Sequence, residues 1–185
     1  MQQKLLFSFG VIFMMKSFLA IAGDNKLQSE LPSSQFREEH AEIKKHLSHI
    51  DLWTGKLRSS SKTAQKNTMM EIVSFFKEHI KPHAEWEEKK LYPAVDRRAC
   101  SGAAVFTASM RWEHKIIDRW ISKLERESSR SSPDAELFSR QTDQLLGLIN
   151  AHFEEEEEVL LPILDRSMTP VEFKDEILSG REHEK

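Results

Sequence analysis

The sequence predicts an all-α protein, folded as an antiparallel up-down-up-down bundle of four helices. Apolar residues recur at alternating steps of three and four in four long segments, the spacing of one face of a helix. Short stretches rich in glycine, serine or proline separate these segments, as expected between antiparallel neighbours. The 185-residue chain is 39% apolar and 31% charged, a composition typical of a globular domain with amphipathic helices.

The first predicted helix begins at Ser33 and Ser34, where a serine can cap the first turn, and ends between Gly55 and residues 59–61. Its stripe keeps the helical spacing only if His40 is counted as a member. The apolar members are Phe36, Ile43, Leu47, Ile50 and Leu57.

The second predicted helix begins near Ala64 and ends at Pro93. Its apolar stripe includes two polar members, His83 and Glu87. Pro82 lies inside the pattern, and we expect it to kink the helix because proline removes a backbone hydrogen bond.

A connection at residues 96–102 leads to the third predicted helix, where His114 occupies an apolar position. The apolar members of that stripe are Phe106, Met110, Ile117, Ile121 and Leu124. The fourth helix follows a serine-rich turn and begins at Asp134, which can cap it. Its stripe again contains polar members, His152 and Glu156.

One motif occurs twice. Residues 83–93 and 152–162 both read H-x3-E-E-x2-L-x-P. A histidine and a glutamate four residues apart lie on one helix face, about 5–6 Å apart at Cβ. Nitrogen and oxygen donors presented together suit a transition-metal ion, and the duplication indicates two ions or one pair.

The four stripe histidines are predicted to meet at one level of the bundle. Counted from the turns between neighbouring helices, their heights differ by only about 2–6 Å at 1.5 Å per residue. Burying unpaired carboxylates and imidazoles would cost more than the roughly 5–15 kcal/mol by which a domain is stable. Either these groups pair with one another or they bind cations, and we predict metal ligands at six positions: His40, His83, Glu87, His114, His152 and Glu156.

The donor set indicates the metal. If each glutamate bridges two ions, each ion takes two imidazoles and two carboxylate oxygens. Near-octahedral ions then keep room for an oxo or hydroxo bridge and one open position, which favours two non-haem iron ions, with manganese as second choice. A tetrahedral structural zinc site does not need this many groups. A small diatomic molecule would bind at the open position.

The duplicated motif, with His40 and His114, resembles the hemerythrin-like (HHE cation-binding) family over residues 34–165. The resemblance implies an antiparallel four-helix bundle around a di-iron centre, with the histidines as terminal ligands and Glu87 and Glu156 as bridges. The oxygen-carrying members have a fifth histidine where this chain has Met110, and place the last acid where it has Glu157. The four-histidine set is more similar to the iron-centre repair proteins, which usually carry an additional cysteine-containing segment.

These observations predict a metal-ion-binding protein that binds or reacts with oxygen or nitric oxide, in sensing, storage or stress protection. The alternatives are a di-iron enzyme (an oxidase, a nitric oxide reductase or an iron-centre repair protein) and an interaction module that metal only stabilises. The sequence identifies no redox partner and no oligomeric state. A net charge of −3 gives no indication of nucleic-acid binding.

The N-terminus contains an apolar run that Lys16 interrupts, so it does not predict a membrane span. Cleavage after Ala22 would export the protein to the periplasm or the medium; otherwise the segment is an apolar tail of a cytoplasmic protein. The predicted divisions are a signal peptide or disordered tail (1–22), a linker (23–33), the bundle (34–165) and a C-terminal short helix or tail (166–185).

Several other residues could take part. His79 could be an extra ligand, although a partly exposed position is expected, and Tyr92 could reach the cavity, although packing at a helix end is expected. Cys100 is a weak candidate for redox sensing and is expected to be only a small loop residue. Glu88 and Glu157 are candidates for accepting hydrogen bonds from the ligands. Glu39 and Glu113 each precede a stripe histidine; they too could support a ligand, but a surface position is expected for both.

Overall fold

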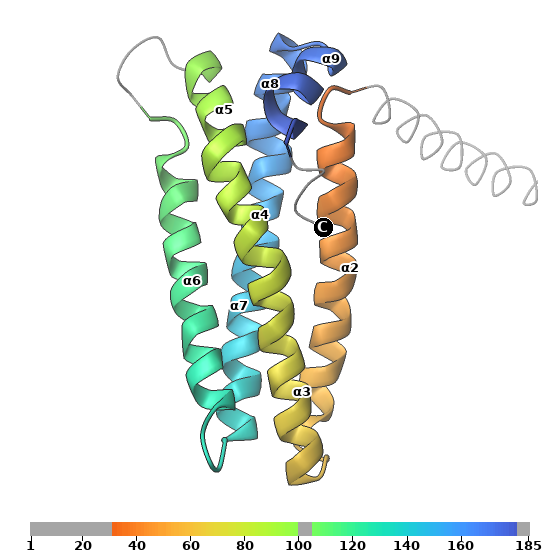
Figure 1. Ribbon diagram of the computed structural model, residues 1–185, viewed down its shortest axis with the longest axis vertical. Helices are drawn as coiled ribbons and strands as arrows, with labels where there is room; N and C mark the ends of the chain where they lie inside the picture. Colours follow the sequence, from red (N-terminus) through yellow and green to blue (C-terminus); the bar gives the residue numbers. More distant parts are fainter. Residues whose placement is uncertain (1–30, 100–104, 181–185) are drawn as a thin grey trace, which may run out of the picture.

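Four long helical rods lie side by side, each antiparallel to the next along the chain (Figure 1). The computed structural model describes residues 31–99 and 105–180. The first rod is α2 (Ser34–Leu57) and the third is α6 (Ala108–Ser128). The second rod is a continuous run of α-helices and π-helical turns: α3 (Lys62–Phe75), η1 (Phe76–Ile80), α4 (Lys81–Trp86), η2 (Glu87–Leu91) and α5 (Tyr92–Ala99).

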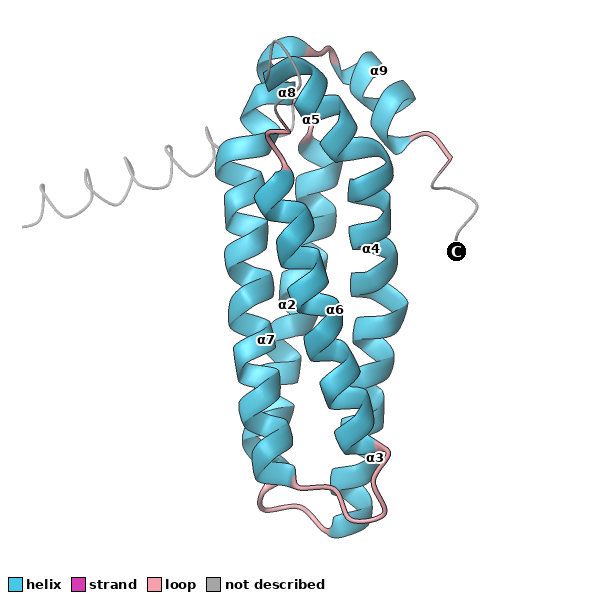
Figure 2. Cartoon of the chain, turned by 90° about the vertical axis from the view of Figure 1, so that its left-hand side faces the viewer, coloured by secondary structure: helices cyan, strands magenta, loops and turns pink. Residues whose placement is uncertain are grey.

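The fourth rod has the same construction as the second. It consists of α7 (Ala135–Glu155), η3 (Glu156–Leu160) and α8 (Leu161–Ser167). A short α9 (Pro170–Phe173) and η4 (Lys174–Leu178) then fold over one end of the bundle (Figure 2). Helix α2 packs against α3 and α7, and α6 packs against the same two, so the rods form a closed square. The all-α prediction is confirmed, since residues 31–99 and 105–180 contain no strand.

Three prolines lie inside the rods, and each follows a π-helical turn. The turns η1, η2 and η3 end two residues before Pro82, Pro93 and Pro162, respectively. Proline lacks an N–H and its ring clashes with the carbonyl four residues earlier, so the helix widens locally instead of breaking. The prediction that Pro93 ends the second helix is therefore wrong, because the rod continues to Ala99.

The rod ends are fixed by side chains, though not always by the predicted ones. Asp134 caps α7 as predicted, accepting hydrogen bonds from the N–H groups of Glu136 and Leu137. Ser33 stands at the N-cap of α2, but its side chain does not cap that helix. Its hydroxyl instead donates to Oδ2 of Asp165 (3.0 Å), which ties the start of the bundle to α8.

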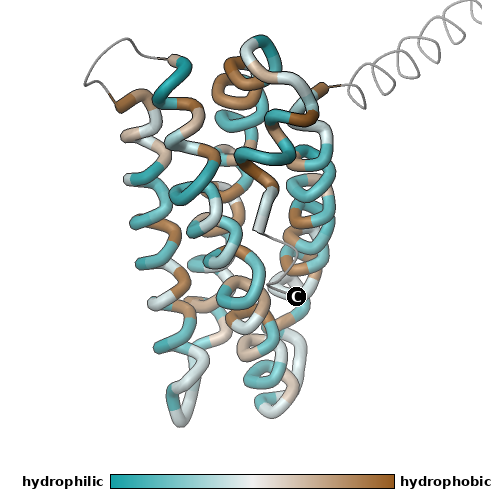
Figure 3. The backbone as a smooth tube through the Cα atoms, turned by 45° about the horizontal axis from the view of Figure 1, so that its top comes forward, coloured by the Kyte–Doolittle hydropathy of each residue, from teal (hydrophilic) through white to brown (hydrophobic). Residues whose placement is uncertain are grey.

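A polar layer divides the core into two apolar clusters. Along α2, Phe36 belongs to one cluster and Ile43 to the other, and His40 lies between them. The same order holds on α6, where His114 separates Met110 from Ile117. Hydrophobic and hydrophilic positions accordingly alternate along every rod (Figure 3). Each fully buried large apolar side chain contributes about 1.5–3 kcal/mol, so both clusters hold the layer between them in place.

Phe106 and the C-terminal segment differ in how well their positions were predicted. Phe106 was assigned to the third helix, but it lies before α6 and is 41% exposed. The C-terminal segment folds into α9 and η4, where Phe173 and Ile177 are buried against the bundle.

Across residues 31–99 and 105–180, every helix is too short or too polar to cross a membrane. The predicted leader (1–22) and Cys100 lie outside the described residues.

Candidate metal centre

The polar layer brings together all six side chains that the sequence singled out. Each is buried, at 7% exposure or less. They form two groups in which the nitrogen and oxygen donors lie within 4.8 Å of one another. One group is His40, His83, Glu87 and Glu156, and the other is Glu87, His114 and His152.

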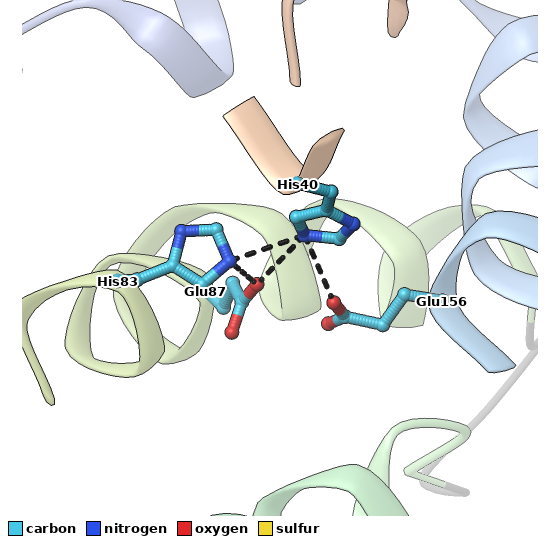
Figure 4. A group of neighbouring side chains, drawn as sticks. All are labelled: His40, His83, Glu87 and Glu156. Carbon is cyan, nitrogen blue, oxygen red and sulfur yellow. Dashed lines mark hydrogen bonds and ion pairs between the residues drawn. The ribbon is translucent and has the colours of Figure 1, made fainter. Parts of the chain in front are cut away.

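The first group is formed by the imidazoles of α2 and α4 (Figure 4). Nε2 of His40 and Nε2 of His83 lie 3.1 Å apart. Oε1 of Glu87 is 2.6 Å from His83 Nε2 and 3.5 Å from His40 Nε2. Oε2 of Glu156 approaches the same place, 3.4 Å from His40 Nε2.

The second group repeats this arrangement with the imidazoles of α6 and α7. Nε2 of His114 and Nε2 of His152 lie 3.0 Å apart. Oε2 of Glu87, the oxygen that faces away from the first group, is 3.1 Å from His114 Nε2. Oε1 of Glu156 is 3.8 Å from His152 Nε2. Each carboxylate therefore directs one oxygen to each pair of imidazoles.

The outer face of every imidazole is held by a carboxylate. Nδ1 of each histidine lies within hydrogen-bond distance of a partly exposed glutamate. The four contacts are His40–Glu157 (3.0 Å), His83–Glu39 (2.9 Å), His114–Glu88 (3.1 Å) and His152–Glu113 (2.8 Å). Because a carboxylate only accepts, Nδ1 carries the hydrogen and Nε2 directs its lone pair into the layer.

These four contacts close a ring around the bundle. Glu39 on the first rod holds the histidine of the second, and Glu88 on the second holds that of the third. Glu113 on the third holds the histidine of the fourth, and Glu157 on the fourth holds that of the first. The sequence anticipated Glu88 and Glu157, whereas the surface role expected for Glu39 and Glu113 is wrong. The signal was present, since each acid is the immediate neighbour of a layer residue and so faces the adjacent rod.

The two inner carboxylates affect each other's protonation. Burial, followed by the charge of Glu87, raises the pKa of Glu156 well above its usual range. Burial would also raise the pKa of Glu87, but the charge of His83 and the imidazoles of His114, His152 and His40 together outweigh burial and hold that pKa well below its usual range. The layer thus keeps one carboxylate ionised and resists a second charge unless a cation offsets both.

One imidazole of each pair is made more basic by its surroundings. Burial lowers the pKa of His83, but the charge of Glu87 and the hydrogen bond to Glu39 outweigh it and raise the pKa to about 9. Burial also lowers the pKa of His152, but the hydrogen bond to Glu113 and the charges of Glu156 and Glu87 raise it to about 10. Protons and metal ions therefore compete for the same inward lone pairs.

The buried carboxylate oxygens of the layer are placed where a cation could bind them. Both oxygens of Glu87 and Oε2 of Glu156 are buried and accept no hydrogen bond, although imidazole nitrogens lie within 2.6–3.5 Å of them. Buried acceptors without donors are costly, and a cation between them satisfies them together. The donors are imidazole nitrogen and carboxylate oxygen, a set that suits divalent transition metals.

Tyr92 also reaches the layer, which is the less favoured of the two positions that the sequence left open for it. The residue is fully buried, and its hydroxyl donates to Oε1 of Glu156 (2.8 Å). Burial, together with the charges of Glu87 and Glu156, raises the pKa of this phenol, which keeps it protonated in their presence.

The remaining candidates lie away from the layer. His79 is exposed on η1 and contacts the ring of Phe75, at 4.9 Å between ring centroids. Met110 packs in an apolar cluster, so it adds no donor to the layer. Of the two acids offered by the second motif, Glu156 points inward and Glu157 holds His40.

Comparisons with known proteins agree with this geometry. The model of the hemerythrin HHE cation binding domain matches residues 31–164, which include the whole polar layer. Searches of curated proteins and of solved structures found no match to the chain. The family match spans most of the chain, and the layer inside it is a buried cluster of metal-ligating groups. This chain is thus a metal-binding member of the hemerythrin HHE cation-binding family.

Proposed function

We propose that the chain is a non-haem di-iron protein that binds or reacts with a small diatomic molecule, oxygen or nitric oxide. The observation that carries the proposal is the sharing of the two carboxylates. Oε1 of Glu87 faces His83 and Oε2 faces His114, and Glu156 likewise directs one oxygen to each pair. Carboxylates shared in this way suit two ions rather than one.

Each ion would be held by two imidazoles and by one oxygen from each glutamate. His40 and His83 would hold the first ion, and His114 and His152 the second. Two iron ions there supply open coordination positions and redox chemistry for a diatomic molecule. The outer carboxylates hold the four rings in the required tautomer and increase the basicity of the inward nitrogens.

A groove gives small molecules a route towards the layer. It has a volume of about 820 Å³ and lies between the second rod and α6. His114 and Glu88 are among its lining residues, as are Lys81 and Asp118, which form an ion pair. The groove therefore reaches one imidazole of the layer, His114, which supports entry of a diatomic from this side.

The test is metal analysis together with optical spectroscopy. After aerobic loading with ferrous iron, we expect two irons per chain and the near-ultraviolet absorption of an oxo-bridged ferric pair. The reduced protein should change its spectrum when nitric oxide or oxygen is added. If the protein retains no iron, or retains iron without any response to either gas, the proposal is wrong.

The same experiment separates a binding protein from an enzyme. A protein that only binds releases its diatomic unchanged when the gas is removed. An oxidase would instead yield water or peroxide, and a nitric oxide reductase would yield nitrous oxide. Supplying manganese in competition with iron identifies the preferred metal.

A further inference from the structure

Tyr92 places an oxygen atom in the polar layer, beside His114 and His152 of the second group. It is the only tyrosine of the 185-residue chain, and its ring is fully buried. Its hydroxyl oxygen lies 3.0 Å from Nε2 of His114 and 3.3 Å from Nε2 of His152. It also lies 2.8 Å from Oε1 of Glu156, so it is close to three of the atoms that could hold a metal ion, two of them from the second group.

The two halves of the layer differ in this respect. Near His40 and His83 the aromatic neighbours are Phe153, whose ring centroid lies 4.2 and 5.4 Å from the two imidazole centroids, and Phe36, at 4.8 and 5.5 Å. Neither phenylalanine has a polar side-chain atom to offer. The layer is therefore symmetric in histidines and carboxylates but asymmetric in oxygen donors.

The Tyr92 hydroxyl has three polar neighbours within 3.3 Å, all of them side chains of the polar layer. A phenol carries one hydrogen, and here that hydrogen is donated to Glu156. Nδ1 of His114 and Nδ1 of His152 face Glu88 and Glu113, so both rings turn Nε2 towards the phenol oxygen. Two imidazole nitrogens, a carboxylate oxygen and the phenol oxygen thus converge, with the other three atoms within 3.3 Å of the phenol oxygen. A cation at their centre satisfies all four.

We propose that the Tyr92 oxygen is a ligand of the ion held by His114 and His152. The inference rests on the proposed function, because it assigns one more ligand to the same metal pair. When the metal–oxygen bond forms, the O–H bond breaks and its proton passes to water; no electron is transferred. Phenolate oxygen is an established protein ligand of ferric iron. The ion at His40 and His83 then has one protein ligand fewer than its neighbour.

Because the chain has one tyrosine, spectroscopy can test this assignment without ambiguity. Iron-loaded ferric protein should show a visible phenolate-to-iron charge-transfer band. Resonance Raman excitation within that band should enhance tyrosine ring vibrations, which shift when the protein is grown with ring-deuterated tyrosine. Tyr92→Phe should lose the band and the ring vibrations while keeping two irons per chain and its helical circular dichroism.

Phe36→Leu is the matched control, because it alters packing at the other half of the layer. It should retain the charge-transfer band. If wild type and Tyr92→Phe bind two irons with identical visible spectra, the tyrosine assignment is wrong and the di-iron proposal stands. If the wild type binds no iron, both are wrong.

Discussion

The carboxylate of Glu113 on α6 accepts a hydrogen bond from Nδ1 of His152 on α7, over 2.8 Å. Glu113 is 23% exposed and His152 is 2% exposed, so a partly solvated acid orients a buried ring. The contact joins two rods at the level of the polar layer and fixes which imidazole nitrogen of His152 faces inward. The same relationship recurs at the other three histidines.

Removing one outer acid should weaken metal binding without unfolding the bundle. Glu113→Ala leaves His152 without its acceptor, so the ring loses its fixed tautomer and orientation. We expect a fall of roughly 10–100-fold in metal affinity, measured by competition with a chromogenic chelator. Glu154→Ala, an exposed position on the same rod as His152, should leave the affinity unchanged. Equal affinities for the two variants would contradict the role assigned to Glu113.

The shared carboxylates lead to a prediction about stoichiometry. His40→Ala removes a donor from one pair only, so about one metal per chain should remain after gel filtration. Glu87→Ala removes an oxygen from both pairs and should leave less than that. Elemental analysis of the two variants beside wild type checks this order. A Glu87 variant that keeps both ions would rule out a bridging role.

Metal should also stabilise the fold, because the ligands come from all four rods. An ion at 100 times its dissociation constant contributes about 2.7 kcal/mol to the free energy of unfolding. For a chain of this size, that corresponds to a rise of about 5–10 °C in Tm. Thermal unfolding with and without a chelator measures the difference. A Tm insensitive to chelation would mean that the folded protein gains nothing from the metal.

A core substitution far from the layer should separate stability from metal binding. Leu124 on α6 is fully buried in the apolar cluster that lies on the opposite side of the layer from α9. Leu124→Ala should lower the free energy of unfolding by about 2–5 kcal/mol, because it leaves a cavity. Denaturant titration measures that loss, and metal content at low temperature should stay at the wild-type value.

Docking of the C-terminal helix should depend on pH. Hydrogen bonds from Arg98 and Arg97 hold the pKa of Glu176 below its ordinary value of 4.5. The folded carboxyl is thus the stronger acid, so its stabilisation is present above pH 4.5 and is lost as pH falls through the lower folded pKa. The side chain is 33% exposed, and solvent screening limits the contribution to about 1 kcal/mol. Hydrogen exchange of η4 should accelerate in acid, and Glu176→Gln should remove that pH dependence.

The bundle and its inner donors could be predicted because helical periodicity constrains both. A histidine such as His114 that completes an apolar stripe must face the core, and counting residues from the turns sets its height. The end of the second helix was predicted wrongly, because Pro93 was interpreted as the residue at which the helix stops. The disruption by Pro93 is absorbed by the preceding π-helical turn, and helix type at that scale depends on packing with other rods.

The outer acids and Tyr92 were harder to predict because they depend on angles between rods. Glu113 adjoins His114 in the sequence, but adjacency alone does not say whether its side chain reaches His152 on the neighbouring rod or turns to solvent. Tyr92 lies in the second rod directly after η2, and a π-helical turn holds more residues than an α-helical one, so it rotates the residues that follow it relative to a regular stripe. Stripe counting assumes a regular helix and cannot anticipate that rotation.

The ring of outer acids has a consequence for how long an ion stays bound. Every rod contributes one imidazole and also the acid that orients the imidazole of the next rod. When one rod swings outward, two rings lose their support at the same moment. Escape of an ion should then follow the breathing of the whole bundle, so residence times would be set by the kinetics of helix opening as much as by equilibrium affinity.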